Sequence, residues 1–313
     1  MSEFSHQPVM PAEVIKFLNP QPGEVILDGT IGLGGHSALI AERLGASGVL
    51  FGIDQDENAL QIARRKLANF PGRLLLRHGN FCEMSSFLQE ESIPEVDGIL
   101  LDLGVSSLQL DSGERGFSYQ QDALLDMRMN PAQEFTAADL VNTYSLSELT
   151  RVLREYGEER WANRIARFIV DQRKKAPFRT TGELVSVVKA AIPARARREG
   201  PHPARRTFQA IRIAVNRELE VLQAGLEQGI SCLKPQGRIV VISFHSLEDR
   251  IVKQTFKNKA QACRCPSGFP ICACGGRPEI KILTPRPVIP TDEEREKNPR
   301  SRSAKLRAAY KLV

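Results

Sequence analysis

The chain has 313 residues, of which 43 are Lys or Arg and 37 are Asp or Glu, so its formal net charge is +6. With 42% hydrophobic residues the composition is that of a globular protein. No apolar stretch approaches the roughly 18–20 residues of a membrane span, and the first residues lack the pattern of a secretory signal. We therefore expect a cytoplasmic protein with no membrane segment, built as two domains or as one domain with an insertion.

Charge is distributed unevenly along the chain. Residues 1–112 hold 7 basic and 15 acidic side chains, whereas residues 151–217 hold 17 basic and 6 acidic ones. Residues 297–311 add 6 basic side chains and no acid. This segregation predicts an acidic ligand-binding lobe beside a basic surface for a polyanion, and nucleic acid is the expected partner. The alternative is a set of solvated helical faces.

Four short apolar runs, each the length of a buried strand, lie between residues 24 and 109. They end at Asp28, Asp54, Phe81 and Asp102. In an open α/β sheet, ligands bind at the carboxyl ends of the strands. The residues at these four ends are therefore expected to line one site.

A glycine-rich turn separates the first run from a helical stretch that begins near Ser37. Its glycines are Gly29, Gly32, Gly34 and Gly35. Strand, glycine turn, helix and a later acid are typical of a nucleotide-type ligand on a Rossmann-like sheet. The spacing does not match the dinucleotide pattern G-x-G-x-x-G, and a pyrophosphate would sit poorly beside Asp28. S-adenosylmethionine (AdoMet) carries a sulfonium and an ammonium but no phosphate, so it suits this turn better. The alternative is a turn that only closes a βα unit.

The strand pattern stops after Gln109 and returns near the end of the chain. Helices are predicted over residues 145–157, 160–175 and 180–191, followed by a basic loop over 194–206. A long helix over 206–233, a turn, a buried strand over 238–244 and a strand pair over 279–284 and 305–313 complete the chain. We predict an α/β fold in which a Rossmann-like methyltransferase-type sheet (residues 1–112 and 206–313, with a basic C-terminal tail) is interrupted by an all-helical substrate-binding domain (113–205).

Motifs in both the sheet and the insertion resemble the bacterial RsmH/MraW family. They are EVILDGTIGLGGHS, GIDQDENAL, DGILLDLGVSS, RGFSY, DMRM, YGEERWANRIA, RRTFQAIRIAVNREL, ISFHSLEDRIVK and NPRSRSAKLRA. The resemblance runs from His6 to the C-terminus. It implies an AdoMet-dependent methyltransferase that acts on the exocyclic N4 amine of a cytidine in the decoding region of 16S rRNA.

The resemblance also implies roles for individual residues. Gly34, Gly35 and His36 would line the methionine side of AdoMet, Asp54 would hold the ribose, Phe81 would contact the adenine, and Asp102 and Gln109 would close the pocket near the methyl group. His36 and Gln109 rest on the resemblance alone. The partner would be 16S rRNA or the small ribosomal subunit, and the protein would be a monomer or a homodimer.

Asp102 is the candidate catalytic residue, and the alternative is that it only contacts AdoMet. The lone pair of the cytosine amine is delocalised into the ring, and a carboxylate that accepts hydrogen bonds from the amine helps to localise it. Many amino-methyltransferases place two prolines and an aromatic residue after this acid, but here the sequence is DLGVSS, so the base must be gripped differently. His245 and Ser246 follow another strand and are weaker candidates to meet the base. Methylation at ring carbon five would need a cysteine thiolate; neither strand end has one, and Cys82 is interpreted as a packed residue.

Two cysteine pairs lie within twelve residues near the C-terminus. They are Cys263, Cys265, Cys272 and Cys274. Four thiolates this close form a candidate structural zinc site, although C-x-C spacing is less usual than C-x-x-C. The alternative is four reduced thiols, and no metal enters the predicted chemistry.

Two other functional classes compete with the methyltransferase hypothesis. A ribosome-assembly factor that uses the sheet only as a scaffold is disfavoured because Gly34, Gly35, Asp54 and Asp102 are all present. A nicotinamide-dependent oxidoreductase is disfavoured by the glycine spacing and by the basic insertion.

Overall fold

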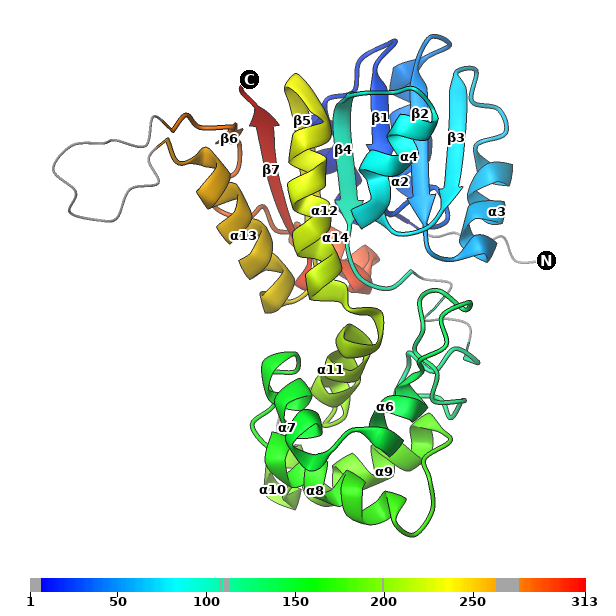
Figure 1. The fold of residues 1–313 in the computed structure, drawn as a ribbon, viewed down its shortest axis with the longest axis vertical. Coiled ribbons are helices and arrows are strands. Elements are labelled where there is room, and N and C mark those ends of the chain that lie inside the picture. Colours follow the sequence, from blue (N-terminus) through cyan, green and yellow to red (C-terminus); the bar gives the residue numbers. More distant parts are fainter. Residues whose placement is uncertain (1–6, 107–108, 110–112, 199, 263–275) are drawn as a thin grey trace, which may run out of the picture. The chain divides into compact units, whose positions relative to one another are not determined.

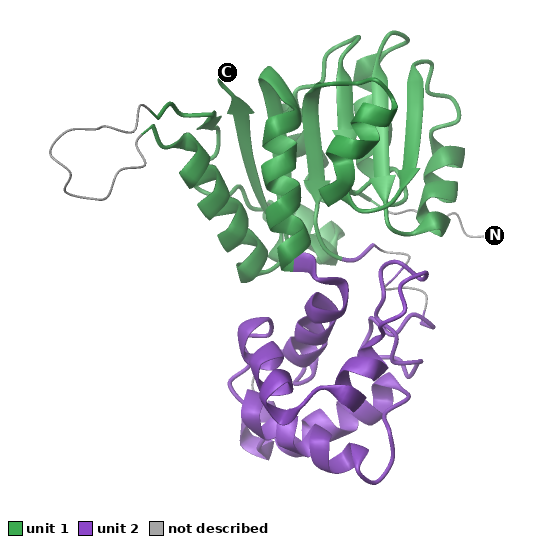
Figure 2. Ribbon diagram, in the orientation of Figure 1, with its two compact units in different colours: residues 1–104, 219–313 green, residues 105–218 purple. Residues whose placement is uncertain are grey.

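The chain forms two compact units (Figure 2). The computed structural model describes residues 7–106, 109, 113–198, 200–262 and 276–313. Unit 1 comprises residues 1–104 and 219–313, and unit 2 comprises residues 105–218. The insertion is thus bounded at residues 104 and 218 rather than at 112 and 205. None of the helices in the described part of the chain has the length and apolar character needed to cross a bilayer.

Unit 1 is built on a seven-stranded sheet with the order β3-β2-β1-β4-β5-β7-β6 (Figure 1). The strands are β1 (Val25–Asp28), β2 (Val49–Asp54), β3 (Arg73–His78), β4 (Val96–Asp102), β5 (Leu233–Ser243), β6 (Ile280–Ile282) and β7 (Lys305–Lys311). Strands β1 to β5 are parallel, and β7 runs antiparallel between β5 and β6. The predicted Rossmann-like α/β sheet is confirmed, including the pairing of the last two strands.

Helices cover both faces of this sheet, and the alternation of side chains along each strand supplies both layers. Leu27, Ile99 and Val241 pack on one face in a cluster with α4 (Met84–Glu90), α12 (Glu218–Cys232) and α13 (Ser246–Ala260). Ile26, Leu100 and Val240 pack on the other face. That second layer is formed by α1 (Pro11–Leu18), α2 (Gly35–Leu44) and α3 (Glu57–Lys66). The buried strands are therefore apolar on successive residues, as the sequence predicted.

The basic residues at the C-terminus are largely used inside unit 1. Residues 305–311 form β7, and Arg307 is 6% exposed, with its Nε 2.7 Å from Asp249 Oδ1. Lys305 also pairs with Asp249, and Lys311 Nζ donates to the carbonyls of Ser231 and Leu233. The expectation that residues 297–311 add to a basic surface for a polyanion is therefore wrong for Arg307 and Lys311, because residues 305–311 form a sheet strand.

Unit 2 is helical, with its own apolar core. Its helices are α6 (Ala137–Thr143), α7 (Leu146–Glu155), α8 (Ala162–Arg173), α9 (Thr181–Ala191), α10 (Ala194–Arg198) and α11 (Arg205–Asn216). Thr136, Ser145 and Thr180 begin α6, α7 and α9, and each forms a capping box with the acid three residues later. The helices predicted over 145–157, 160–175 and 180–191 are confirmed. The basic stretch 194–206 is not a loop throughout, because residues 194–198 are helical.

The single long helix predicted over 206–233 is wrong, because α11 ends at Asn216 and α12 begins at Glu218. Between them Arg217 adopts a left-handed conformation with φ 50°, which ends a right-handed helix. The Asn216 side chain accepts from the Met129 N–H (2.7 Å) and donates to the Met127 carbonyl (2.8 Å). A long-range contact thus fixes the break, and local helical propensity gave no sign of it.

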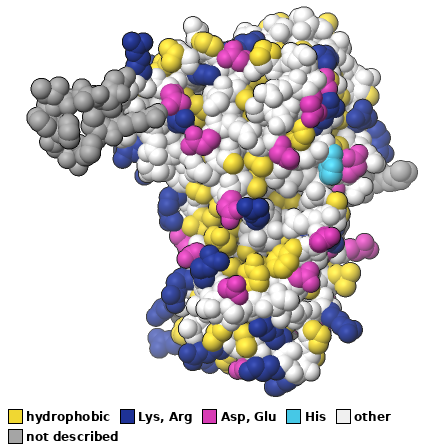
Figure 3. Space-filling model, viewed as in Figure 1, with side chains coloured by type: hydrophobic (Ala, Val, Ile, Leu, Met, Phe, Trp, Pro, Cys, Tyr) yellow, Lys and Arg dark blue, Asp and Glu magenta, His cyan; other side chains and the backbone are white. Residues whose placement is uncertain are grey.

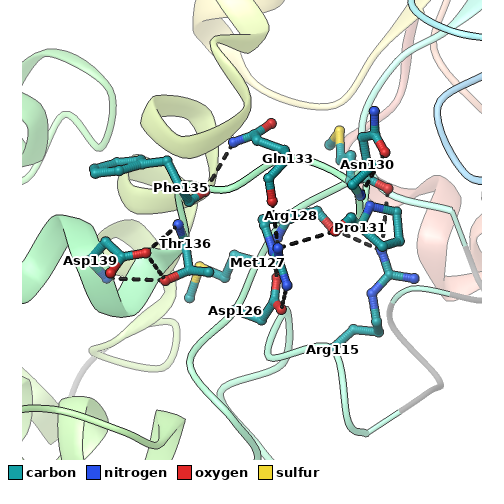
Figure 4. A network of polar contacts seen from close by, with 12 residues as sticks. Arg115, Asp126, Met127, Arg128, Asn130, Pro131, Gln133, Phe135, Thr136 and Asp139 are labelled. Atoms are coloured by element: carbon teal, nitrogen blue, oxygen red, sulfur yellow. Dashed lines mark hydrogen bonds and ion pairs between the residues drawn. The ribbon is translucent and has the colours of Figure 1, made fainter.

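The same amide anchors a segment without regular structure that precedes α6. Figure 4 shows the polar contacts within this segment. The Arg128 guanidinium makes two bonds to the Asp126 carboxylate (2.8 and 2.7 Å) and donates to the Pro131 and Gln133 carbonyls. Arg115 donates to the carbonyl of Arg128 (2.8 Å). The RGFSY and DMRM motifs therefore encode a loop held by arginine bonds to the backbone.

Replacing Asn216 by Ala should destabilise unit 2. The change leaves a buried N–H and a buried carbonyl without partners, so we expect a loss of about 2–3 kcal/mol in the free energy of unfolding. Urea denaturation followed by the fluorescence of Trp161, the single tryptophan, measures it, since this residue packs on the core of unit 2. The control is Asn163→Ala on the exposed face of α8. Equal midpoints for the two variants would contradict the anchoring role.

Candidate functional site

Three acidic residues end neighbouring parallel strands at one edge of the sheet in unit 1. Strand β1 lies between β2 and β4, with Asp28 opposite Gly52 on one side and Leu100 on the other. Asp54 and Asp102 each lie two residues beyond those partners. Parallel pairing therefore brings three carboxylates from distant parts of the sequence to one edge.

Asp28 organises the glycine turn from within. Its carboxylate is 1% exposed and accepts bonds from the Ser37 hydroxyl (2.7 Å) and the Thr30 N–H (3.2 Å). Burial raises the pKa of this carboxyl, and the Ser37 bond opposes the shift. Both carboxylate oxygens of Asp28 thus accept hydrogen bonds from the protein itself, one from Thr30 and one from Ser37. Asp28 therefore stabilises the glycine turn, and it does not select a cationic ligand as the sequence suggested.

Gly34 joins the glycine turn to α2 as the N-cap residue of the helix, and its φ is 76°. A Cβ at this position would lie 3.5 Å from Ala63, and the left-handed conformation disfavours any other residue. Helix α2 begins at Gly35, two residues earlier than expected, and no side chain in the described part of the chain caps it. Its first N–H groups are therefore available to a ligand.

Asp54 links the end of β2 to the glycine turn. Its oxygens accept from the Gly32 N–H (2.8 Å) and the Asp56 N–H (2.9 Å). The pKa of Asp54 is raised to about 6, chiefly by burial and also by the charges of Asp56 and Asp28, against the lowering effect of these two backbone bonds. The residue is not fully buried, so part of the acceptor capacity of its carboxylate remains accessible.

Asp102, His36 and Thr30 meet beside this turn. The Thr30 hydroxyl accepts the Asp102 N–H at 2.7 Å, which connects the turn to β4. His36 Nε2 lies 3.6 Å from Asp102 Oδ2, and His36 is 7% exposed. Neither ring nitrogen of His36 nor Oδ1 of Asp102 has a hydrogen-bond partner among the described residues. Buried polar atoms of this kind require a partner, which a ligand can supply.

Thr30 is a residue that the sequence reasoning missed. Its position between Asp28 and Gly32 marks it as part of the turn, but a threonine in a turn is ordinary. Only the pairing of β1 with β4 reveals that its hydroxyl meets the Asp102 backbone.

The other predicted site residues are Phe81, Gln109 and the four clustered cysteines. Phe81 begins the short helix η1 (Phe81–Glu83) and is 8% exposed in the apolar core. A Cβ built on Gly225 would lie 2.4 Å from its ring, so the ring packs on that glycine and little of it is left for an adenine. Gln109 belongs to unit 2, where its carboxamide accepts the Ser106 N–H at 3.0 Å. The four clustered cysteines, Cys263, Cys265, Cys272 and Cys274, lie outside the described residues.

Comparison with known proteins gives a match over almost the whole chain. The family model described as MraW methylase family matches residues 3–312. A protein of Heliobacterium modesticaldum named ribosomal RNA small subunit methyltransferase H is 54% identical over 310 residues, which cover 99% of each chain. Its namesake in Geobacter sulfurreducens is 57% identical over 309 residues, again 99% of each.

Solved structures align less closely. A putative rRNA-methylase from Clostridium thermocellum matches 96% of this chain and 95% of its own with a TM-score of 0.44 and 12% identity. A putative methyltransferase from Streptococcus mutans, in complex with SAH, has a TM-score of 0.41 and 10% identity over 98% of this chain and 100% of its own. Likeness at this level carries no further conclusion.

The raised pKa of Asp54 should appear as a pH-dependent stability. Between about pH 4 and pH 6 the folded, unliganded protein keeps a proton that the unfolded chain has released, so this residue lowers the stability as the pH rises. Asp54→Asn removes that titration. We expect the unfolding free energy of the variant minus that of the wild type to increase by on the order of 2 kcal/mol between pH 4 and pH 7.5.

Urea denaturation across this pH range, without ligand, gives the difference. Glu42→Gln on the exposed face of α2 is the control, and its difference should not vary with pH. A flat profile for Asp54→Asn would show that the carboxylate ionises at its ordinary pKa.

Proposed function

Because the chain belongs to the MraW methylase family, we propose that it transfers the methyl group of AdoMet to the exocyclic N4 amine of a cytidine in the decoding region of 16S rRNA. At the coarser level it is an AdoMet-dependent methyltransferase of small-subunit rRNA. The cytidine, its N4 position and the decoding region are supported by the resemblance of the motifs in both units.

The cofactor site is proposed at the glycine turn of unit 1. The start of α2 at Gly35 and His36, just after the N-cap Gly34, offers backbone N–H groups to the carboxylate of the methionine moiety. The free acceptor capacity of Asp54 suits the two ribose hydroxyls. His36 and Asp102 then lie toward the methyl group. The cofactor contacts proposed for Phe81 and Gln109 rest on the resemblance of the motifs alone.

One observation carries the catalytic proposal: Asp102 Oδ1 is buried at the end of β4 without a hydrogen-bond partner among the described residues. An amino group has two N–H donors and satisfies such an acceptor. A bond from the amine to this carboxylate raises the electron density on nitrogen as the methyl arrives. After transfer the nitrogen carries a positive charge, and the carboxylate beside it is placed to accept the proton.

The positions of the two described cysteines, Cys82 and Cys232, favour methylation of the amine over methylation at ring carbon five. Cys232 ends α12, just before the start of β5 and away from the carboxyl edge, and burial raises the pKa of its thiol. A covalent mechanism needs a thiolate instead. Cys82 follows Phe81 on η1, beside the proposed adenine contact rather than at the end of β4.

RNA binding is proposed for the helical surface of unit 2. Lys and Arg side chains gather over its helices on the face drawn in Figure 3. Arg195, Arg197 and Arg198 on α10 are exposed, and the described chain provides no carboxylate partner for them. Unpaired cations on a surface bind phosphates through counterion release.

The direct test is mass mapping of modified nucleosides in small-subunit rRNA. Purified protein and AdoMet, added to subunits from cells that lack the protein, should convert one decoding-region cytidine to N4-methylcytidine. The fragmentation pattern distinguishes a methyl group on the amine from one on the ring. A product methylated at C5, or no change in the decoding region, would contradict the proposal.

Asp102→Asn should separate chemistry from cofactor binding. We expect the methylation rate at saturating AdoMet to fall by about 10²–10⁴, the usual contribution of a general base. The AdoMet dissociation constant should change much less. Asp97→Asn is the control on the same strand, since this acid pairs with Lys234 near the start of β4. Equal losses in rate and affinity would leave Asp102 with a cofactor contact only.

Removing the three arginines of α10 should weaken RNA binding without affecting the cofactor. Arg195→Ala with Arg197→Ala and Arg198→Ala should reduce the log–log salt slope by up to about one unit per lost phosphate contact. AdoMet affinity should stay unchanged. The matched control is the triple Ala variant of Arg64, Arg65 and Lys66, exposed on α3 in unit 1. If both triple variants retain the wild-type slope, RNA docks elsewhere.

A further inference from the structure

Unit 1 contains a cavity at the carboxyl end of β5 that is lined by both polar and apolar side chains. Its volume is about 370 Å³, against about 10–15 Å³ for a single water. The polar residues that line it are His245, Ser246, Arg295, Arg302, Ser303 and Lys305. They come from the start of α13, from α14 (Asp292–Lys297), from η2 (Pro299–Ser303) and from the first residue of β7.

The charges around this cavity favour an anion. Three cationic side chains line it and no acid does. Lys305 shares Asp249 with Arg307, and Arg295 pairs with Asp292, whose side chain is 94% exposed. Arg302 is exposed and has no ion-pair partner within the described ranges. The lining therefore keeps a net positive charge.

Two buried side-chain nitrogens at the cavity also lack hydrogen-bond partners within the described residues. They are Nε2 of His245 and Nε of Arg295. The His245 side chain is 9% exposed, and its Nδ1 accepts the Glu248 N–H at 3.4 Å. Glu248 Oε1 lies 3.2 Å from Nε2 but makes no hydrogen bond with it.

The cavity is next to the proposed methyl-transfer site within unit 1. Strands β4 and β5 pair with Asp102 opposite Ile242, and the cavity begins two residues later at Phe244. A Cβ built on Gly104, in the turn after Asp102, would lie 3.5 Å from the Phe244 ring. A group bound here is thus separated from Asp102 by about one strand spacing and a turn.

We propose that this cavity binds a backbone phosphate of the RNA next to the target nucleotide. The inference rests on the proposed function, because a cytidine that enters beside Asp102 must leave its stack and carry its flanking phosphates with it. A fixed phosphate holds the flipped nucleotide in register, since phosphate contacts position a nucleic acid without reading its sequence. Arg302, which has no competing carboxylate, is the principal contact.

Arg302→Ala tests this cavity without disturbing the core. Binding to small subunits from cells that lack the protein is measured across a range of salt concentrations. We expect a several-fold weaker affinity and a salt slope reduced by up to about one unit. Arg302→Lys should restore most of the slope, and Arg64→Ala on α3 should leave it unchanged. AdoMet affinity and the unfolding midpoint should equal those of the wild type.

Two outcomes would overturn the proposal. One is a wild-type salt slope in Arg302→Ala. The other is calorimetric binding of inorganic phosphate that depends on Arg302 while subunit binding does not, which would mark a site for a free anion. Because the readout is binding, the result is independent of which nucleoside becomes methylated. Failure of the N4-cytidine proposal would appear in the mass mapping instead.

Discussion

The hydrogen bond from the Asp102 N–H to the Thr30 hydroxyl, 2.7 Å long, is the contact on which the site in unit 1 depends. It ties the end of β4 to the glycine turn after β1. The same turn is held to β2 by the bond between the Gly32 N–H and Asp54, and from within by Asp28 and Ser37. Three strand ends are thus locked around one loop. This arrangement keeps His36 and Asp102 close together before any ligand arrives.

The strand ends around this loop bring the carboxylates of Asp28, Asp54 and Asp102 together in a partly buried site, where burial disfavours the ionised form of a carboxyl group. The raised pKa values of Asp28 and Asp54 express that cost. Two hydrogen bonds from the protein offset this cost at Asp28. Asp54 and Asp102 keep acceptor capacity that the protein itself does not use. Ribose hydroxyls and a cytosine amine are neutral donors, and the AdoMet sulfonium is a cation. The proposed substrates therefore relieve the electrostatic cost that the unliganded site retains, so that stability and binding are opposed at the same residues.

Cations are used in two different ways in this chain. Arg128 and Arg307 form ion pairs inside the protein. Arg128 holds the loop before α6, and Arg307 joins β7 to α13. Arg195, Arg197, Arg198 and Arg302 have no such partner in the described chain. Only the second group is available to RNA phosphates. A count of basic residues does not separate the two groups, because pairing is a property of the folded structure.

The sequence by itself determined the sheet, the glycine turn and the strand ends that carry Asp54 and Asp102. These follow from local rules: apolar runs of strand length, glycines where φ must be positive, and an acid at each turn. It also indicated the helical insertion and, through its motifs, the family. What the tertiary structure decided were contacts between residues far apart in the chain. The bonds of Asn216 to residues 127 and 129 set the helix break at Arg217. The pairing of β1 with β4 brings the Thr30 hydroxyl to the Asp102 backbone. Arg307 is buried because it forms an ion pair with Asp249 on another element. A pattern within a short window contains no information about such partners, and so these features required the folded chain.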